Sequence, residues 1–155
     1  MRKIKDKNEL LSLFKDKDQD SISIPVDMKF PLGVKDQLIW SDQSGYKSFL
    51  VFKDLDSDVL YGAVFKRANS GTASNHSSSM CDWCHRVGST QDVSLYTVEL
   101  NDKHSVGTYI CDHLSCRDHI EASPGTNEMR ETLRVQQKIE RLQKRIGTFL
   151  KRNIF

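Results

Sequence analysis

The hydrophobic positions in the first half of the chain predict one short helix followed by several strands. Four apolar residues lie among charged ones within residues 6–17, which is typical of an amphipathic helix: Leu10, Leu11, Leu13 and Phe14. Apolar and polar residues alternate over 22–26, which predicts an edge strand. Three further strands are expected at 37–40, 46–53 and 59–67, with a hairpin turn at 54–58. Together they predict a small, mostly antiparallel sheet.

The second half predicts a hairpin and two helices. Strands are expected at 92–100 and 105–110, joined by the turn residues 101–104, and a helix is expected to start within 112–120. The clearest helix covers 127–152, with Thr126 or Asn127 as its cap. Its apolar residues recur at helical spacing and form one stripe: Val135, Ile139, Leu142, Ile146, Phe149 and Leu150.

These elements predict an α+β fold in a single domain of residues 1–155. Its parts are a helix with antiparallel strands (1–67), a mobile loop (68–79), a metal-binding segment (80–120) and the C-terminal helix. The loop has no large apolar side chain to offset its ordering entropy, so it is a linker or a segment that orders on a partner. The large aromatic side chains are expected in the core or on a sheet face: Trp40, Phe49, Phe52, Tyr61 and Phe65.

Composition narrows the class of protein. The chain has 155 residues, of which 37% are hydrophobic and 28% charged, and no apolar run approaches the ~18 residues of a membrane-spanning helix. The first 14 residues lack the long apolar segment and the cleavage site of a signal peptide. We therefore expect a cytoplasmic protein.

Positive charge is concentrated near the C-terminus. The net charge is only +2, but residues 121–155 hold eight basic and four acidic side chains. Six basic residues cluster along one flank of the apolar stripe of the C-terminal helix: Arg130, Arg134, Lys138, Arg141, Arg145 and Arg152. Such a flank is either a solvated surface or a contact for an acidic partner such as ribosomal RNA or an acidic protein.

All four cysteines lie within 36 residues, in two close pairs: Cys81 and Cys84, then Cys111 and Cys116. In a cytoplasmic chain such pairs indicate a metal site, and four thiolates favour zinc. A knuckle, a hairpin and a short helix in this order are the layout of a treble-clef zinc finger. A redox dithiol at Cys81 and Cys84, and four reduced cysteines without metal, are the alternatives. A neighbouring histidine, His85, His113 or His119, is a further candidate ligand.

Four protein ligands fill the shell of a zinc ion, so the predicted zinc is structural rather than catalytic. The signature of zinc deaminases is absent, because Ser77 and Ser78 follow His76 and Met80 precedes Cys81. No other catalytic constellation stands out, and we expect no enzyme. A structural zinc contributes ~10–16 kcal/mol in finger peptides, so chelation is expected to unfold at least residues 80–120.

These motifs resemble the FBP family of bacterial proteins, related to the zinc-containing C-terminal domain of FusB-type elongation-factor-G-binding proteins. The resemblance rests on Met80-Cys81-x-x-Cys84, on Val106 to Cys111 with Cys116, and on Arg130-Glu131-Thr132-Leu133 with Ile139-Glu140-Arg141-Leu142. It is strongest over residues 80–150 and implies that the four cysteines are the zinc ligands.

The resemblance also implies a partner. Members of the family bind elongation factor G and help to release it from ribosomes stalled by fusidic acid. Charged or aromatic residues near the predicted zinc are the candidate contacts: Trp83, His85, Arg86, Lys103, His104 and Arg117. An RNA- or ribosome-binding protein that uses the basic flank of the C-terminal helix is the alternative function.

Overall fold

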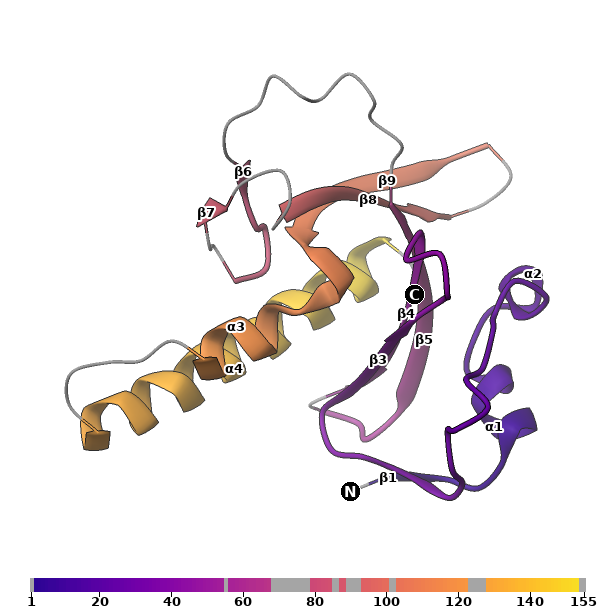
Figure 1. Ribbon diagram of the computed structural model, residues 1–155, viewed down its shortest axis with the longest axis horizontal. Helices are drawn as coiled ribbons and strands as arrows, with labels where there is room; N and C mark the ends of the chain where they lie inside the picture. Colours follow the sequence, from indigo (N-terminus) through magenta and orange to yellow (C-terminus); the bar gives the residue numbers. More distant parts are fainter. Residues whose placement is uncertain are drawn as a thin grey trace. The chain divides into compact units, whose positions relative to one another are not determined.

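A computed structural model describes residues 2–54, 56–67, 79–84, 87–88, 93–100, 103–122 and 128–153, with the backbone alone at 79, 87–88, 122 and 128–134. The chain folds into two compact units, Met1–Arg67 and Ala68–Phe155. The predicted loop 68–79 lies outside the described residues except for Ser79, and so do His85 and Arg86. Each unit combines helices with antiparallel strands, which confirms the predicted α+β class (Figure 1).

The first unit contains three strands that pair antiparallel in the order β3 (Gln37–Ser41), β4 (Lys47–Lys53) and β5 (Leu60–Arg67). All three strands were predicted from the sequence, at 37–40, 46–53 and 59–67. A second, two-stranded sheet pairs β1 (Arg2–Ile4) with β2 (Leu32–Val34), and neither strand was predicted. Three-residue strands are too short to show a period in the sequence.

Two short helices, α1 (Lys7–Ser12) and α2 (Asp16–Gln19), replace the single helix predicted over 6–17. Asp6 caps the first, because its side chain accepts a hydrogen bond from the Glu9 N–H at 2.8 Å. At the end of α1, the carbonyl of Leu13 accepts a hydrogen bond from the Gly62 N–H of β5 at 3.0 Å. The backbone of Lys15 is extended and separates the two helices.

The predicted edge strand at 22–26 is wrong. The segment is irregular because its polar backbone is used differently: the Ser23 carbonyl accepts a hydrogen bond from the Trp40 indole N–H at 2.8 Å. Ile22 and Ile24 still pack against the core of the unit, which explains their spacing.

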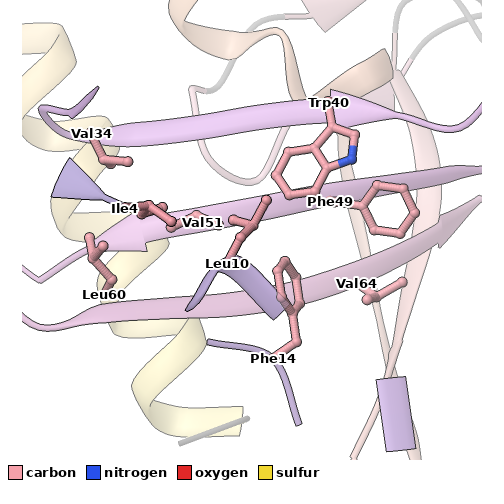
Figure 2. Packing of buried hydrophobic residues seen from close by; sticks show 9 residues of the cluster. All are labelled: Ile4, Leu10, Phe14, Val34, Trp40, Phe49, Val51, Leu60 and Val64. Carbon is pink, nitrogen blue, oxygen red and sulfur yellow. The ribbon is translucent and has the colours of Figure 1, made fainter. Parts of the chain in front are cut away.

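That core lies between α1, the segment after it, and one face of the sheet (Figure 2). Phe14 meets Trp40 edge to face, with ring centroids 6.1 Å apart, and Trp40 meets Phe49 at 5.3 Å. Burial of each large apolar side chain contributes roughly 1.5–3 kcal/mol. The cluster consists of Ile4, Leu10, Phe14, Val34, Trp40, Phe49, Val51, Leu60 and Val64.

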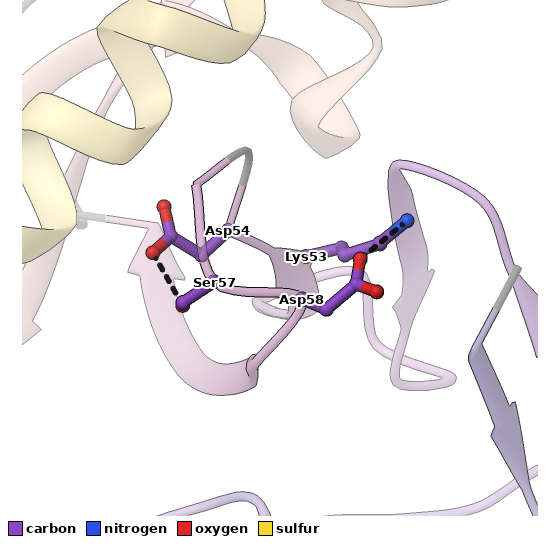
Figure 3. A network of polar contacts seen from close by, with 4 residues as sticks. All are labelled: Lys53, Asp54, Ser57 and Asp58. Atoms are coloured by element: carbon purple, nitrogen blue, oxygen red, sulfur yellow. Dashed lines mark hydrogen bonds and ion pairs between the residues drawn. The ribbon is translucent and has the colours of Figure 1, made fainter.

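The turn between β4 and β5 has the polar chemistry that the sequence predicts (Figure 3). The Ser57 hydroxyl donates to a carboxylate oxygen of Asp54 at 2.7 Å, and Lys53 pairs with Asp58 at 2.9 Å. Asp58 has φ 60°, a left-handed conformation that aspartate adopts more readily than most residues.

The described part of the second unit begins with a small hairpin of β6 (Ser79–Met80) and β7 (Val87–Gly88). A longer hairpin follows, β8 (Val93–Glu99) with β9 (Ser105–Cys111), close to the predicted bounds. A 3-10 turn, η2 (Asp112–Leu114), and α3 (Cys116–Ala122) occupy the segment where a helix was expected. The C-terminal helix α4 covers Glu128–Asn153, and Leu142, Ile146 and Leu150 of its predicted stripe are buried.

Candidate metal centre

Three separate segments of the second unit bring the cysteines to one place. Cys81 directly follows β6, and Cys84 lies in the turn between β6 and β7. Cys111 is the last residue of β9, and Cys116 is the first residue of α3. This placement is the knuckle, hairpin and helix arrangement predicted from the spacing, because residues five apart do not share one face of a helix.

The four sulfur atoms lie within 4.8 Å of one another. The Sγ atoms of Cys81 and Cys116 are 3.5 Å apart, as are those of Cys84 and Cys111. A disulfide bond needs about 2.05 Å, so neither pair is oxidised. Metal–sulfur bonds of ~2.3 Å in a tetrahedron require sulfur–sulfur edges of about 3.8 Å, so the cluster has the dimensions of a tetrathiolate zinc site.

The four thiols interact strongly enough to shift the pKa values of one another. The pKa of the Cys81 thiol lies far below its ordinary value, because the thiols of Cys111, Cys116 and Cys84 all hydrogen bond to its sulfur. The pKa of the Cys116 thiol lies far above its ordinary value, because hydrogen bonds to Cys111 and Cys81 hold its proton and burial disfavours its charged form. Several thiolates in so small a volume repel one another, and a bound divalent cation removes that cost.

Hydrogen bonds from the backbone and from Asp82 position the first pair of ligands. The Cys84 N–H points at the Cys81 sulfur at 3.4 Å, as expected for a turn that wraps around a metal. Asp82 attaches this turn to β9: its N–H donates to the Tyr109 carbonyl at 2.7 Å, and its carboxylate accepts from the Tyr109 N–H at 3.1 Å and the Thr108 hydroxyl at 2.8 Å. Cys81 is thereby held beside the strand that ends in Cys111.

The second pair depends on a strained turn. His113 and Leu114 have φ values of 56° and 55°, a left-handed region that costs roughly 1–2 kcal/mol for residues other than glycine. The hydroxyl of Tyr96, a fully buried side chain of β8, accepts a hydrogen bond from the His113 N–H at 3.0 Å. This bond helps to hold the turn that leads from Cys111 to Cys116.

The predicted candidate ligands and contacts fall into distinct environments. His113 and His119 are not members of the group of four ligand atoms, and His85 lies outside the described residues. Lys103 and His104 are exposed just before β9, and Arg117 pairs with Glu121 at 3.1 Å. Trp83 does not have the exposure expected of a partner contact, because it is 3% exposed and packs on Phe149 with ring centroids 5.9 Å apart.

The predicted basic flank of α4 is divided in the same way. Lys138, Arg141 and Arg152 are exposed, whereas Arg145 is partly buried and donates to the Trp83 carbonyl at 2.8 Å. The side chains of Arg130 and Arg134 lie outside the described residues. Sequence reasoning missed Asp82, Tyr96 and the knuckle contact of Arg145, since polar residues that act through the backbone leave no pattern in a single sequence.

The hairpin, the two cysteine pairs and the helix that begins at a ligand define a treble-clef zinc finger with one structural zinc site. The bound ion supplies cross-linking, because four thiolates leave it no open position for a substrate. A family model described as "FBP C-terminal treble-clef zinc-finger" matches residues 10–153. The chain therefore belongs to this family.

A solved structure described as that of the fusidic acid resistance protein FusC aligns with a TM-score of 0.48 and 21% sequence identity, covering 73% of this chain and 51% of that one. The chain thus spans about half the length of that protein. No curated protein matched the sequence. Within the described part of the chain, no helix combines the length and the apolar character needed to cross a membrane.

Proposed function

We propose that the chain is a zinc-stabilised binding protein that associates with elongation factor G and promotes its release from the ribosome, the activity linked to fusidic acid resistance. Membership of the FBP zinc-finger family carries the proposal. The ligand set supports the proposal, because four buried or half-buried thiolates suit a structural metal ion, which stabilises a binding surface, rather than a catalytic one.

The mechanism is binding alone. A bound protein shifts a partner between two states only to the extent that it binds one of them more tightly. We propose that this chain binds the form of elongation factor G that leaves the ribosome more tightly than the form that stays. Lys103 and His104, exposed at the end of the β8–β9 hairpin, are proposed as contacts.

A titration with purified elongation factor G, followed by calorimetry, tests the proposal. We expect a 1:1 complex with a Kd in the micromolar range or below, weakened at least tenfold by a Lys103→Glu, His104→Glu double variant. Lys29→Glu is the matched control, because Lys29 is an exposed lysine of the first unit. Absence of binding by the zinc-loaded wild-type protein at micromolar concentrations would refute the proposal.

The exposed cations of α4 favour a second candidate function, binding to ribosomal RNA. Lys138, Arg141 and Arg152 are exposed on the helix, together with Lys144 and Lys151. Contacts of this kind with phosphates release counterions, so the affinity falls steeply with salt. Arg141→Glu is expected to weaken binding to ribosomal RNA and to flatten its salt dependence. An affinity unchanged by this substitution would exclude the RNA contact.

A further inference from the structure

One peptide group of the zinc knuckle is hydrogen bonded at both ends. It is the peptide between Trp83 and Cys84. Its N–H donates to the Sγ atom of Cys81 at 3.4 Å, and its carbonyl oxygen accepts from the Nη1 atom of Arg145 at 2.8 Å. Three groups therefore lie in series: the guanidinium of α4, the peptide, and a sulfur of the metal centre.

We propose that Arg145 is a positioning residue of the zinc centre and acts on the Cys81 sulfur through this peptide. A cation at the carbonyl oxygen draws electron density from the amide nitrogen, which makes the N–H a stronger donor. A stronger N–H···S bond stabilises the thiolate form that binds zinc. Four thiolates around a divalent ion carry a net negative charge, so a cation bonded to the knuckle also lowers the cost of burying them.

The packing around Arg145 keeps this arrangement in place. Phe149 lies one helical turn after Arg145, and its ring meets the Trp83 ring edge to face at 5.9 Å. The carbonyl and the side chain of one knuckle residue are thus both held by α4. Trp83 is 3% exposed, so water competes little for its carbonyl.

The coupling works in both directions. If docking of α4 tightens zinc binding, zinc binding must tighten the docking of α4 by the same factor. Arg145 therefore differs from the exposed cations of the same helix: its charge serves the metal centre, whereas theirs face solvent.

The test compares Arg145→Gln with Arg141→Gln in the full chain. Both variants remove one arginine charge from α4, but Arg141 is exposed and lies one turn earlier. Zinc affinity is measured by competition with a chromophoric chelator. Loss of a group that supports metal ligands typically lowers the metal affinity 10–100-fold. We therefore expect a 10–100-fold loss of zinc affinity for Arg145→Gln and a change of less than about twofold for Arg141→Gln.

A second measurement separates the effect of Arg145 through the Trp83–Cys84 peptide from a general loss of packing. In the zinc-loaded protein, the amide proton of Cys84 is expected to move upfield in Arg145→Gln, because its bond to sulfur weakens. Equal zinc affinity of the two variants would overturn the proposal, and so would an unmoved Cys84 amide proton in an Arg145→Gln protein that has lost affinity. Should Arg145→Gln not fold, Arg145→Lys is used in its place. Because lysine keeps the positive charge, we expect a zinc affinity and a Cys84 amide chemical shift close to those of the wild-type protein. A loss of zinc affinity of tenfold or more in Arg145→Lys would refute the role of the charge.

Discussion

Substitution of Gly62 by alanine tests a close contact in the core of the first unit. A Cβ atom at this position would lie 2.8 Å from two ring carbons of Phe14 and 2.9 Å from a third. Carbon atoms pack favourably at about 3.5–4.0 Å, so the ring or the strand must move by roughly 0.7 Å or more. Neither can move easily, because Phe14 is 3% exposed and packs on Trp40, and the Gly62 N–H is bonded to the Leu13 carbonyl.

The cost follows from two opposing effects. Overpacking of a core typically costs 1–3 kcal/mol, whereas alanine loses less backbone entropy than glycine on folding, which returns roughly 0.4–1 kcal/mol. We therefore expect Gly62→Ala to lower the free energy of unfolding by about 1–2 kcal/mol. For a chain of this size that corresponds to a fall in Tm of roughly 2–8 °C.

Urea unfolding followed by circular dichroism measures the effect. Gly107→Ala is the matched control, since its Cβ would meet only the tip of the Leu95 side chain at 3.2 Å. The contact itself is isolated by a double-mutant cycle with Phe14→Ala, which removes all three ring carbons that the new Cβ atom would meet. We expect the double variant to be about 1 kcal/mol more stable than the sum of the single changes predicts.

Two results would refute this reasoning. One is a Gly62→Ala protein no less stable than the Gly107→Ala control. The other is additivity of Gly62→Ala and Phe14→Ala within about 0.5 kcal/mol, which would mean that the methyl group and the ring do not compete for the same space.

Three further predictions concern the metal centre and the turns. Chelation of zinc is expected to unfold the second unit, because the metal contributes energy comparable to the stability of a whole domain; a circular-dichroism melt unchanged after chelation would contradict this. Tyr96→Phe leaves the His113 N–H without its hydroxyl acceptor and is expected to cost about 0.5–1.5 kcal/mol in urea unfolding, whereas an unchanged midpoint would show that water replaces the hydroxyl. The pKa of Asp58 is lowered by its hydrogen bond from Lys53, so its stabilising effect is present at neutral pH and lost as the pH falls through the lowered value; an NMR titration of Lys53→Gln should show this pKa returning upward.

The sequence predicted the longer strands well. Strands β3, β4, β5, β8 and β9 begin and end within one or two residues of their expected limits, because each is a segment rich in β-branched and aromatic residues next to turn residues. The prediction of an edge strand at 22–26 was wrong, because alternation alone does not reveal which hydrogen-bond partners a backbone has. The carbonyl of Leu13, between α1 and α2, is bonded to the N–H of Gly62, which is about fifty residues further along the chain, and the local sequence does not reveal such a partner.

The metal centre was predictable for a different reason. Four thiols in two close pairs favour a zinc site, so residue type and distance along the chain suffice. The groups that position the ligands could not be found in this way. Asp82 and Arg145 bond to main-chain atoms of other segments, and main-chain atoms are the same in every sequence.

The bonds of Asp82 to Tyr109 also have a consequence for the metal-free protein. β9 pairs with β8 on one side, and on its other side the backbone groups of Tyr109 are occupied by Asp82. Loss of zinc releases the turn that carries Asp82 and uncovers this side of the strand. An uncovered strand edge recruits strands of other molecules, so metal depletion favours self-association of the chain as well as its unfolding.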